Sequence, residues 1–185
     1  KNLLGDILTF PELQDCTISL HDIDPVRLQT AEAMARWTAK ALGATPTIEA
    51  HLDRKKALDG ADYAINMIQV GGHAATLIDF DIPRKYGVKQ TIGDSHSIGG
   101  IFRALRTIPV MTGIAQDMEA VCPKAMMLNY TNPMSMLCWG WFTASSIPIV
   151  GLCHSVQYTT WQISQYAGVN YDEVTYLGGG INHVA

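Results

Sequence analysis

The sequence predicts an α/β protein in which a parallel sheet is covered by helices on both faces. Short apolar segments alternate with helical segments along the 185 residues, and such alternation is typical of parallel sheets. The strand-like segments are almost continuously apolar, as expected for strands that are buried on both faces. Polar or glycine-rich residues directly follow several of them, at the carboxyl ends where open parallel sheets bind ligands.

Six segments are predicted as strands because they are short and apolar and are bounded by turn residues. They cover residues 16–21, 46–50, 61–68, 125–130, 147–152 and 173–177. The carboxyl ends of such strands share one rim of a doubly wound sheet, so residues that follow them are expected to gather there.

Helical segments fill the intervals between these strands. They are predicted over residues 3–8, 26–42, 53–58, 73–86 and 101–121, from 131–134 onward, and over 156–167. Asp24 and Pro25 supply an N-cap and a first-turn proline for the second helix, and Gly43 ends it. Pro83 and Pro109 are expected to interrupt the fourth and fifth helices, because proline lacks the N–H that a helix interior needs.

The composition is that of a globular protein and excludes several classes of function. Hydrophobic residues make up 48% of the chain and charged residues 16%, with a formal charge of -4. This acidic balance argues against a nucleic-acid partner, because phosphate binding needs a basic face. No apolar run reaches the roughly 18 residues of a membrane span, and residues 1–6 are too short for a secretory signal.

The four cysteines have no paired spacing, and they are interpreted as reduced thiols of a cytoplasmic protein. They are Cys16, Cys122, Cys138 and Cys153.

Asp22 follows the first predicted strand, where a dinucleotide-binding domain carries an acidic residue for the adenosine ribose. Its carboxylate would accept hydrogen bonds from both ribose hydroxyls and would repel a 2′-phosphate. The alternative is that Asp22 and Asp24 only cap the next helix. The glycine-rich loop that would decide between these roles is absent from the chain.

Three further sites carry residues suited to ligands, each with a structural alternative. Gly71 and Gly72 let the backbone approach a ligand closely, or they form an ordinary strand-to-helix turn. The Asn132 amide suits a sugar hydroxyl or a carboxamide, but Asn132 also fits a helix cap before Pro133. Asp94 lies in a loop between helices, where a turn or cap role is the simpler interpretation.

Cys153 and His183 are candidate metal ligands. Thiolate and imidazole bind borderline-soft divalent metals, and two protein ligands leave positions open for substrate. Cys153 follows a strand in polar company, and His183 follows a glycine turn that could return it to the same rim. His154 would point elsewhere if the strand continued, so it is a poor co-ligand but a candidate acid. The alternative is two unrelated loops with one buried cysteine.

Four motifs, taken in order, resemble glycoside hydrolase family 4, most closely its α-galactosidase (melibiase) branch. They are residues 66–72, 128–134, 151–157 and 180–183, and residues 99–109 strengthen the match with that branch. The resemblance covers nearly the whole chain. It implies an NAD- and Mn²⁺-dependent glycosidase on a Rossmann-like, doubly wound fold similar to that of lactate and malate dehydrogenases.

The chemistry implied by the resemblance differs from that of most glycosidases, which flank the scissile bond with two carboxylates. Bound NAD transiently oxidises C3 of the sugar, and a base then removes the acidified C2 proton. The glycosidic oxygen leaves with help from an acid, water adds, and the hydride returns. The metal stabilises the charge that develops on the C2 and C3 oxygens.

The resemblance also assigns roles to residues of this chain. The residues expected at the cofactor are Asp22, Gln69, Gly71 and Asn129. The expected metal ligands are Cys153 and His183, the sugar contacts Asn132 and Asn182, and the candidate acids Asp94 and His154. Relatives that act on phosphorylated β-glucosides carry Asp where this chain has His154, which favours an unphosphorylated α-galactoside. α-Glucosides and α-glucuronides are the alternative substrates.

Residues 1–152 are expected to form a partial NAD-binding domain, and residues 153–185 to begin a catalytic, metal-binding domain. The chain lacks an initiator methionine and stops after an informative motif, so we expect a fragment truncated at both ends. The tyrosine that the family uses as C2 base would lie beyond Ala185, so we expect the fragment alone to be inactive. The expected partners are a small-molecule glycoside and further copies of the chain in a homo-oligomer.

Two alternatives compete with this assignment. A 2-hydroxy acid dehydrogenase of the same fold would clamp its substrate carboxylate with arginines, and Arg103 and Arg106 are available. It would also need a histidine paired with a carboxylate, and the sequence shows no matching arrangement of His and Asp. The second alternative is a nucleotide- or metal-binding remnant without enzymatic activity.

Overall fold

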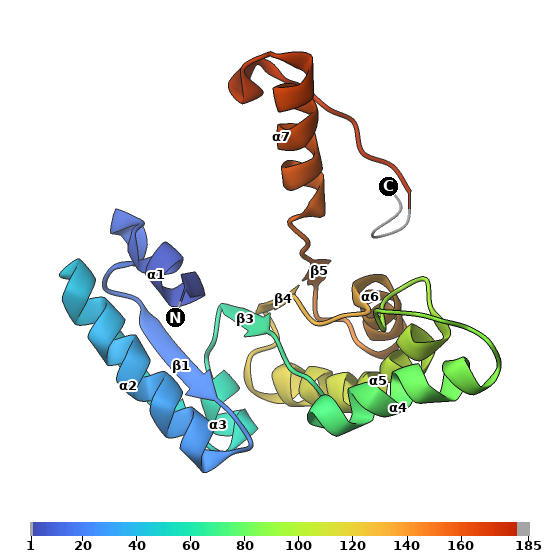
Figure 1. Cartoon of the computed structure of the whole chain (residues 1–185). Helices are drawn as coiled ribbons and strands as arrows, with labels where there is room; N and C mark the ends of the chain where they lie inside the picture. Colours follow the sequence, from blue (N-terminus) through green and yellow to red (C-terminus); the bar gives the residue numbers. More distant parts are fainter. Residues whose placement is uncertain (1, 181–185) are drawn as a thin grey trace. The chain divides into compact units, whose positions relative to one another are not determined.

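A computed structural model of the chain describes residues 2–180 (Figure 1). The chain divides into two compact units, which are considered separately below. One comprises Lys1–Ala61 with Ala120–Pro123, and the other comprises Asp62–Glu119 with Lys124–Ala185. Each unit contains a parallel sheet whose strands are connected by helices, so the α/β class predicted from the sequence is confirmed.

The first unit is built on two parallel strands and the helix that connects them. β1 (Thr17–His21) pairs with β2 (Thr47–His51) along its whole length. α2 (Pro25–Leu42) forms the connection, and α1 (Asn2–Leu8) packs against it. The short η1 (Pro11–Leu13) and α3 (Arg54–Leu58) complete the unit. Its buried core consists of Leu8, Ala35, Ala39, Ala44 and Ile48.

The boundaries of α2 confirm the signals predicted from the sequence. The Asp24 carboxylate accepts hydrogen bonds from the backbone N–H groups of Val26 and Arg27, at 2.8 and 3.0 Å. Pro25 occupies the first turn, and Gly43 ends the helix with a φ of 69°. Glycine adopts this left-handed conformation without the steric penalty of a Cβ.

The second unit is built on a three-stranded parallel sheet in the order β3–β4–β5. The strands are β3 (Tyr63–Asn66), β4 (Met126–Asn129) and β5 (Ile149–Gly151). Their register sets the last residue of each strand beside the last residue of its neighbour. The three carboxyl ends are therefore level.

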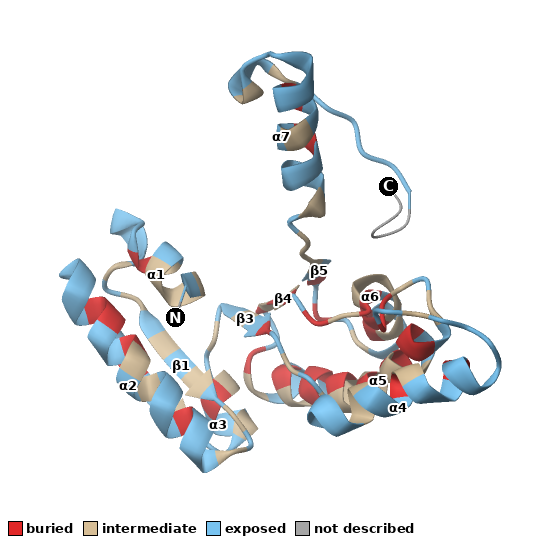
Figure 2. Ribbon diagram, in the orientation of Figure 1, coloured by how far each residue is buried: buried red, intermediate tan, exposed pale blue. Residues whose placement is uncertain are grey.

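Four helices and one short turn belong to the second unit. They are α4 (Gly72–Lys85), α5 (Ile98–Val121), α6 (Met134–Ala144), α7 (Ser155–Ala167) and η2 (Tyr171–Glu173). Buried positions recur along α5, whereas α7 has few of them (Figure 2). The buried residues of α7 are Thr160 and Ser164, and its large aromatic side chains are exposed.

A buried amide network joins the carboxyl ends of β3 and β4. The Asn66 amide donates to Asn129 Oδ1 at 2.9 Å and to Thr131 Oγ1 at 3.2 Å. The Asn129 amide donates to the Thr131 carbonyl at 3.1 Å, and the Thr131 hydroxyl donates to the Ile68 carbonyl at 3.2 Å. All three polar side chains belong to residues at most 4% exposed. Because buried polar groups are costly without partners, the network fixes how the chain leaves these strands.

The predicted helix breaks at Pro83 and Pro109 are wrong, because both prolines lie inside continuous helices. Pro83 deprives the Asp79 carbonyl of its helical donor, and the Gln90 side-chain amide donates to that carbonyl instead, at 3.3 Å. Pro109 is exposed, as is Leu105 one turn earlier, so water can solvate the carbonyl that Pro109 leaves without a donor.

The predicted strand over residues 173–177 is also wrong. The chain forms η2 there and then continues without regular structure to residue 180. The Asn170 side chain accepts a hydrogen bond from the Asp172 N–H at 3.3 Å and caps η2. A β-rich composition makes a strand only where a neighbour offers hydrogen bonds, and within residues 2–180 the sheets contain β1 to β5 alone.

Replacing Asn129 with leucine should lower the free energy of unfolding by about 2–4 kcal/mol, because the Asn66 amide and the Thr131 N–H would lose a buried acceptor. Urea unfolding followed by circular dichroism measures this change. The exposed Gln157 provides the control, since Gln157→Ala should stay within about 0.5 kcal/mol of wild type. Equal stability of the two variants would contradict a structural role for the network.

Candidate functional site

The second unit brings half of the predicted site residues to one rim of its sheet. They are Gln69, Gly71, Asn132, Cys153 and His154, which lie a few residues beyond the level ends of β3, β4 and β5. The backbone ladder continues slightly past these ends. The Tyr130 N–H donates to the Asn66 carbonyl, and the Leu152 N–H donates to the Asn129 carbonyl, each at 2.9 Å. The residue before Cys153 is therefore held directly against β4.

The turn after β3 presents bare backbone at the start of α4. Gly71 and Gly72 have φ values of 82° and 60°, which are left-handed conformations suited to glycine. A Cβ on Gly72 would meet nothing within 4 Å, so this side of the turn is open. The Gln69 amide donates to Thr76 Oγ1 at 2.8 Å and braces the turn against the first turns of α4.

The closed side of the same turn rests on Arg106 from α5. A Cβ on Gly71 would approach Arg106 Nε to 3.3 Å, and this Nε donates to the Val70 carbonyl at 3.0 Å. The two terminal nitrogens of Arg106 donate to the two oxygens of Asp79 at 3.0 and 2.7 Å. Hydrogen bonding to Asp79 raises the pKa of the Arg106 guanidinium above its ordinary value.

The sequence did not reveal this pairing. It suggested Arg106 only as a clamp for a substrate carboxylate, whereas the carboxylate that Arg106 binds belongs to the protein. Asp79 lies between Ile78 and Phe80 in an apolar part of α4. An acidic residue in such a segment is the signal for a buried ion pair, but it does not identify the partner.

Asp94 is buried in the loop between α4 and α5, with 5% of its surface exposed. Its Oδ1 accepts hydrogen bonds from the Ser95 N–H at 2.6 Å and from the Ser95 hydroxyl at 3.2 Å. The hydroxyl of Ser135, in the first turn of α6, donates to Ser95 Oγ at 3.2 Å. The loop that carries Asp94 therefore lies against the start of α6, close in sequence to Asn132.

Two glycines let this loop approach α5. A Cβ on Gly100 would overlap the Asp94 carbonyl, and one on Gly99 would overlap the Gln90 side chain. Ser97, rather than Asp94, accepts the hydrogen bond from the Gly100 N–H, at 2.9 Å. Of the turn or cap role considered for Asp94, the turn is confirmed, because the Asp94 carbonyl accepts a hydrogen bond from the Ser97 N–H at 3.0 Å.

Asn129 and Asn132 differ in their surroundings. The Asn129 side chain is fully buried, and its amide is used within the network at the strand ends. The cap role considered as the alternative for Asn132 is not observed, because the N-cap of α6 is Pro133. Asn132 is half-buried. The cofactor contact expected for Asn129 and the sugar contact expected for Asn132 remain predictions.

Cys153 and His154 connect β5 to α7. Cys153 is half-buried, and its thiol donates to the Ser155 hydroxyl at 3.1 Å. The exposed His154 is the N-cap of α7 in a helical conformation, so the strand does not continue through it. Its direction therefore cannot be deduced from strand alternation. A Cβ on Gly151 would overlap Met134 of α6, so close packing there also requires glycine.

The second predicted metal ligand, His183, and the second sugar contact, Asn182, lie outside the described residues. Within residues 2–180, no three His, Cys, Asp or Glu side chains gather into a metal site. The predicted pair of metal ligands therefore remains a prediction.

Asp22 belongs to the first unit and follows β1. Its Oδ1 and Oδ2 accept hydrogen bonds from the Arg27 guanidinium at 2.6 and 3.0 Å, and Oδ1 also accepts one from the Asp24 N–H. The bond from Arg27 holds the pKa of Asp22 below its ordinary value. Asp24 alone caps α2, so Asp22 does not have the cap role considered for it. Its ribose contact remains a prediction.

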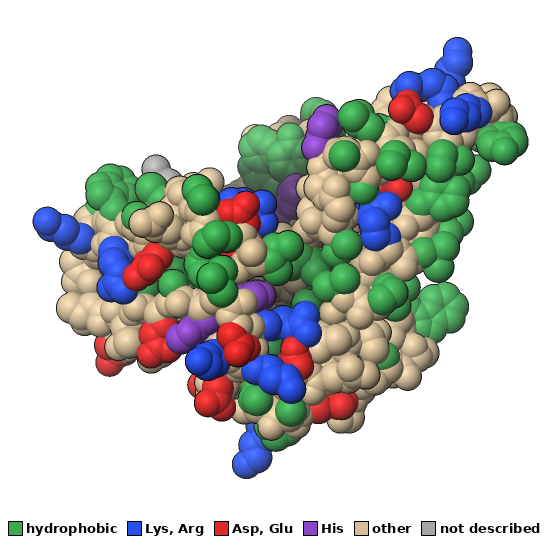
Figure 3. All heavy atoms as spheres, turned by 90° about the horizontal axis from the view of Figure 1, so that it is seen from below, with side chains coloured by type: hydrophobic (Ala, Val, Ile, Leu, Met, Phe, Trp, Pro, Cys, Tyr) green, Lys and Arg blue, Asp and Glu red, His purple; other side chains and the backbone are tan. Residues whose placement is uncertain are grey.

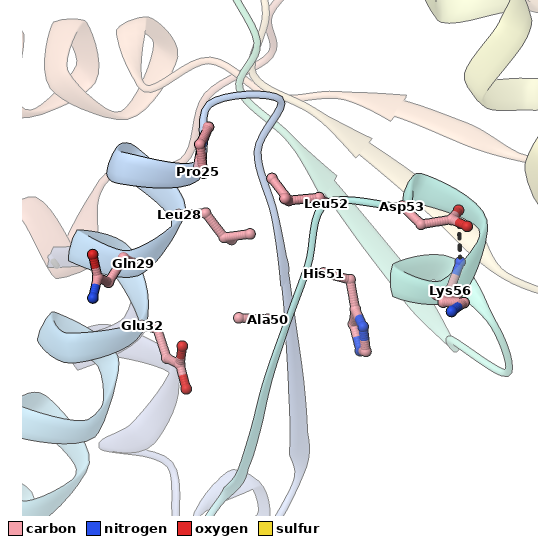
Figure 4. A pocket seen from close by; sticks show the side chains of 9 residues that line it. All are labelled: Pro25, Leu28, Gln29, Glu32, Ala50, His51, Leu52, Asp53 and Lys56. Carbon is pink, nitrogen blue, oxygen red and sulfur yellow. Dashed lines mark hydrogen bonds between the residues drawn. The ribbon is translucent and has the colours of Figure 1, made fainter.

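A groove of about 470 Å³ lies between α2 and the end of β2 in the first unit (Figure 4). Its lining mixes apolar with charged side chains and includes none of the predicted site residues. Asp53 is already used there as the cap of α3, and Glu32 is paired with Arg36. The lining therefore selects no class of ligand.

The molecular surface mixes charges of both signs. On the face drawn in Figure 3, acidic side chains lie beside Lys and Arg side chains, and apolar side chains are exposed between them. None of the helices within residues 2–180 combines the length and the apolarity needed to span a bilayer.

The family model of the family 4 glycosyl hydrolases matches residues 1–169. The chain belongs to this family. An α-galactosidase from Bacillus subtilis is 47% identical over 100% of this chain and 43% of its own length, and one from Rhizobium meliloti is 39% identical over 99% and 38%. An α-glucosidase from Erwinia rhapontici is 34% identical over 97% and 40%. The chain thus spans about two fifths of the length of these relatives.

Solved structures confirm the fold class. A glucosidase from Bacillus subtilis has a TM-score of 0.78 at 27% identity, covering 94% of this chain and 41% of that protein. A 6-phospho-α-glucosidase from gut microorganisms, solved with NAD and Mn²⁺, has a TM-score of 0.77 at 19% identity, with coverage of 93% and 40%. A malate dehydrogenase from Plasmodium falciparum has a TM-score of 0.66 at 15% identity, with coverage of 94% and 48%. The fold is Rossmann-like, as predicted.

Replacing Gly100 with alanine should lower the free energy of unfolding by about 1–3 kcal/mol, because the new methyl group would push the Asp94 carbonyl away from α5. Gly5→Ala is the matched control. A Cβ on Gly5 in α1 would meet Thr38 no closer than 3.9 Å, so this variant should be as stable as wild type or slightly more stable. Urea unfolding of both variants checks the pair. A Gly100→Ala protein as stable as Gly5→Ala would contradict the close approach.

Proposed function

We propose that this family 4 chain belongs to an NAD- and Mn²⁺-dependent glycoside hydrolase that cleaves an unphosphorylated α-galactoside. The main support is the 47% identity to the Bacillus subtilis α-galactosidase along the whole chain. The geometry adds one observation. The Gly71–Gly72 turn, Asn132 and Cys153 all follow strands whose carboxyl ends are level. The division into a cofactor domain (residues 1–152) and the start of a catalytic domain (residues 153–185) is part of this proposal.

The turn at Gly71 and Gly72 fits a dinucleotide. Its open side carries no side chain, and the N-terminus of α4 begins directly after it. Backbone N–H groups at such a terminus attract phosphate groups. Gln69 braces the turn through its hydrogen bond to Thr76. Considered by itself in the first unit, Asp22 is the proposed acceptor for hydroxyls of the adenosine ribose, and its hydrogen bond from Arg27 lowers the pKa of its carboxyl.

The surroundings of Cys153 fit a metal ligand. Its thiol is half-buried rather than enclosed in the core, and Ser155 is its polar neighbour at 3.1 Å. Cys138, in contrast, is buried beside Asn129, and burial raises the pKa of its thiol. Cys153 is therefore the better candidate of the two, with His183 as the proposed second ligand.

The reaction then divides between the bound groups and the protein. When bound, NAD would supply hydride transfer at C3, and Mn²⁺ would stabilise negative charge on the sugar oxygens. Asn132 and Asn182 would orient the sugar through its hydroxyls. Asp94 would hold a proton for the departing glycosidic oxygen, and the exposed His154 is the second candidate for that role.

The dehydrogenase alternative loses one of its two arginines in this structure. Arg106 is bound to Asp79 and to the Val70 carbonyl, so it cannot also clamp a substrate carboxylate without breaking a buried ion pair. The observation favours the glycosidase.

A cytoplasmic location and a homo-oligomeric assembly complete the proposal. None of the four cysteines, all within residues 2–180, forms a disulfide, which suits a reducing compartment. Large apolar side chains are exposed on one stripe of α5, where contact with another copy would bury them. They are Ile98, Ile101 and Leu105.

A panel of glycosides assayed with the full-length protein tests the function. We expect hydrolysis of α-galactosides in preference to α-glucosides and 6-phosphoglycosides, with activity lost when either NAD or Mn²⁺ is withheld. Cys153→Ser should raise the Mn²⁺ concentration needed for half-maximal rate by about tenfold or more. Buried Cys138→Ser is the thiol control and should leave that concentration unchanged. Hydrolysis that survives removal of both cofactors would refute the proposal.

Replacing Asp94 with asparagine tests the acid. An alkyl galactoside needs a proton on its leaving oxygen, so its kcat/KM should fall by about 100-fold or more. A 4-nitrophenyl galactoside leaves without protonation and should lose less than about tenfold. The exposed Asp81 on α4 provides the matched control, and Asp81→Asn should cleave both substrates as wild type does. Unchanged cleavage of the alkyl substrate by Asp94→Asn would remove Asp94 from this role.

A further inference from the structure

We propose that Arg106 is a positioning residue for the cofactor, because it sets the Val70–Gly72 turn and is itself held by the buried Asp79. The inference rests on the proposed function, in that this turn is taken as a contact for NAD. It concerns a residue pair on α4 and α5, beyond the strand-end positions that the sequence indicated.

The guanidinium of Arg106 makes two different kinds of contact at once. Its terminal nitrogens form a two-pronged ion pair with Asp79, and its Nε donates to the Val70 carbonyl at 3.0 Å. A planar guanidinium can satisfy both partners because its donors are fixed relative to one another. The position of Asp79 therefore determines the direction in which Nε points.

Asp79 leaves the arginine little freedom. Asp79 is 1% exposed, and a buried carboxylate without its partner is strongly unfavourable. Arg106 must stay paired, so its Nε stays aimed at the turn. The pair also joins three segments, because Asp79 lies on α4, Arg106 lies on α5, and Val70 belongs to the loop after β3.

Gly71 is complementary to this arrangement. A Cβ at this position would come within 3.3 Å of Arg106 Nε and within 2.6 Å of the Ala75 side chain. The arginine thus packs against the bare side of Gly71 while it binds the carbonyl of the preceding residue. Fixing the Val70 carbonyl fixes the plane of the peptide that enters Gly71, and with it the direction of the backbone offered to a ligand.

Lysine cannot reproduce these contacts. Its ammonium is a point charge on a flexible chain, and it can neutralise Asp79 without also holding the Val70 carbonyl. Arg106→Lys should therefore keep the buried charge balanced while it releases the turn. Arg84 and Asp81 on α4 form a matched pair of the same two residue types, but their side chains are 64% and 59% exposed. Exposed pairs of this kind contribute little, so Arg84→Lys is the control.

The experiment measures binding of NAD and of Mn²⁺ separately on the full-length protein. Titration calorimetry gives the NAD affinity, and electron paramagnetic resonance of free Mn²⁺ gives the metal affinity. We expect Arg106→Lys to raise the Kd for NAD at least tenfold and to leave the Kd for Mn²⁺ within twofold of wild type. Arg84→Lys should leave both unchanged. If Arg106 had a purely structural role, Arg106→Lys would raise the Kd values for NAD and for Mn²⁺ together, or it would change neither.

Two results would overturn the inference. One is an Arg106→Lys protein that binds NAD as wild type does, and the other is a parallel loss of NAD and Mn²⁺ binding. Should Arg106→Lys fail to fold, Asp79→Asn takes its place. This variant keeps the shape of the side chain and weakens the two-pronged ion pair with Arg106. Failure of both variants to fold would also overturn the inference. A wild-type protein that binds Mn²⁺ but no NAD would instead contradict the proposed function.

Discussion

The register of β3, β4 and β5 is the constraint on which the second unit depends. Asn66, Asn129 and Gly151 lie side by side at the ends of these strands, so three distant parts of the chain emerge at one edge. A slip of one residue would turn the side chains of a strand to the opposite face and would separate the two asparagines. The buried amide network thus stabilises the register of the strands, and this register places the residues that follow the strands along one rim.

Local sequence signals were enough to predict the ends of a helix where no residue distant in the sequence takes part. Asp24 and Gly43 bound α2 as predicted, because a cap and a left-handed glycine act within one turn. Two of the failures, at Pro83 and over residues 173–177, depend on hydrogen-bond partners outside the predicted segment. Pro83 stays within α4 because Gln90 supplies the missing hydrogen bond. The rim could likewise be predicted from strand ends, whereas the ion pair of Asp79 and Arg106, 27 residues apart, could not.

Close packing against neighbouring backbone or side chains explains three glycines around the site. Gly100 admits the Asp94 loop, Gly71 admits the Arg106 side chain, and Gly151 admits the Met134 side chain. Each of these glycines belongs to a motif that carried the resemblance to the family. These motifs therefore contain glycines that close packing requires, in addition to side chains that could bind a ligand.

The exposed aromatic face of α7 has a practical consequence for handling the protein. Tyr158 and Trp161 stack at 5.8 Å on this helix, and Tyr166 lies almost wholly in solvent, while the small polar Thr160 and Ser164 are buried. An apolar face of this kind tends to associate with any similar surface. Preparations of residues 1–185 would therefore be prone to aggregate, and a solubilising fusion partner placed after α7 would shield these exposed aromatic side chains.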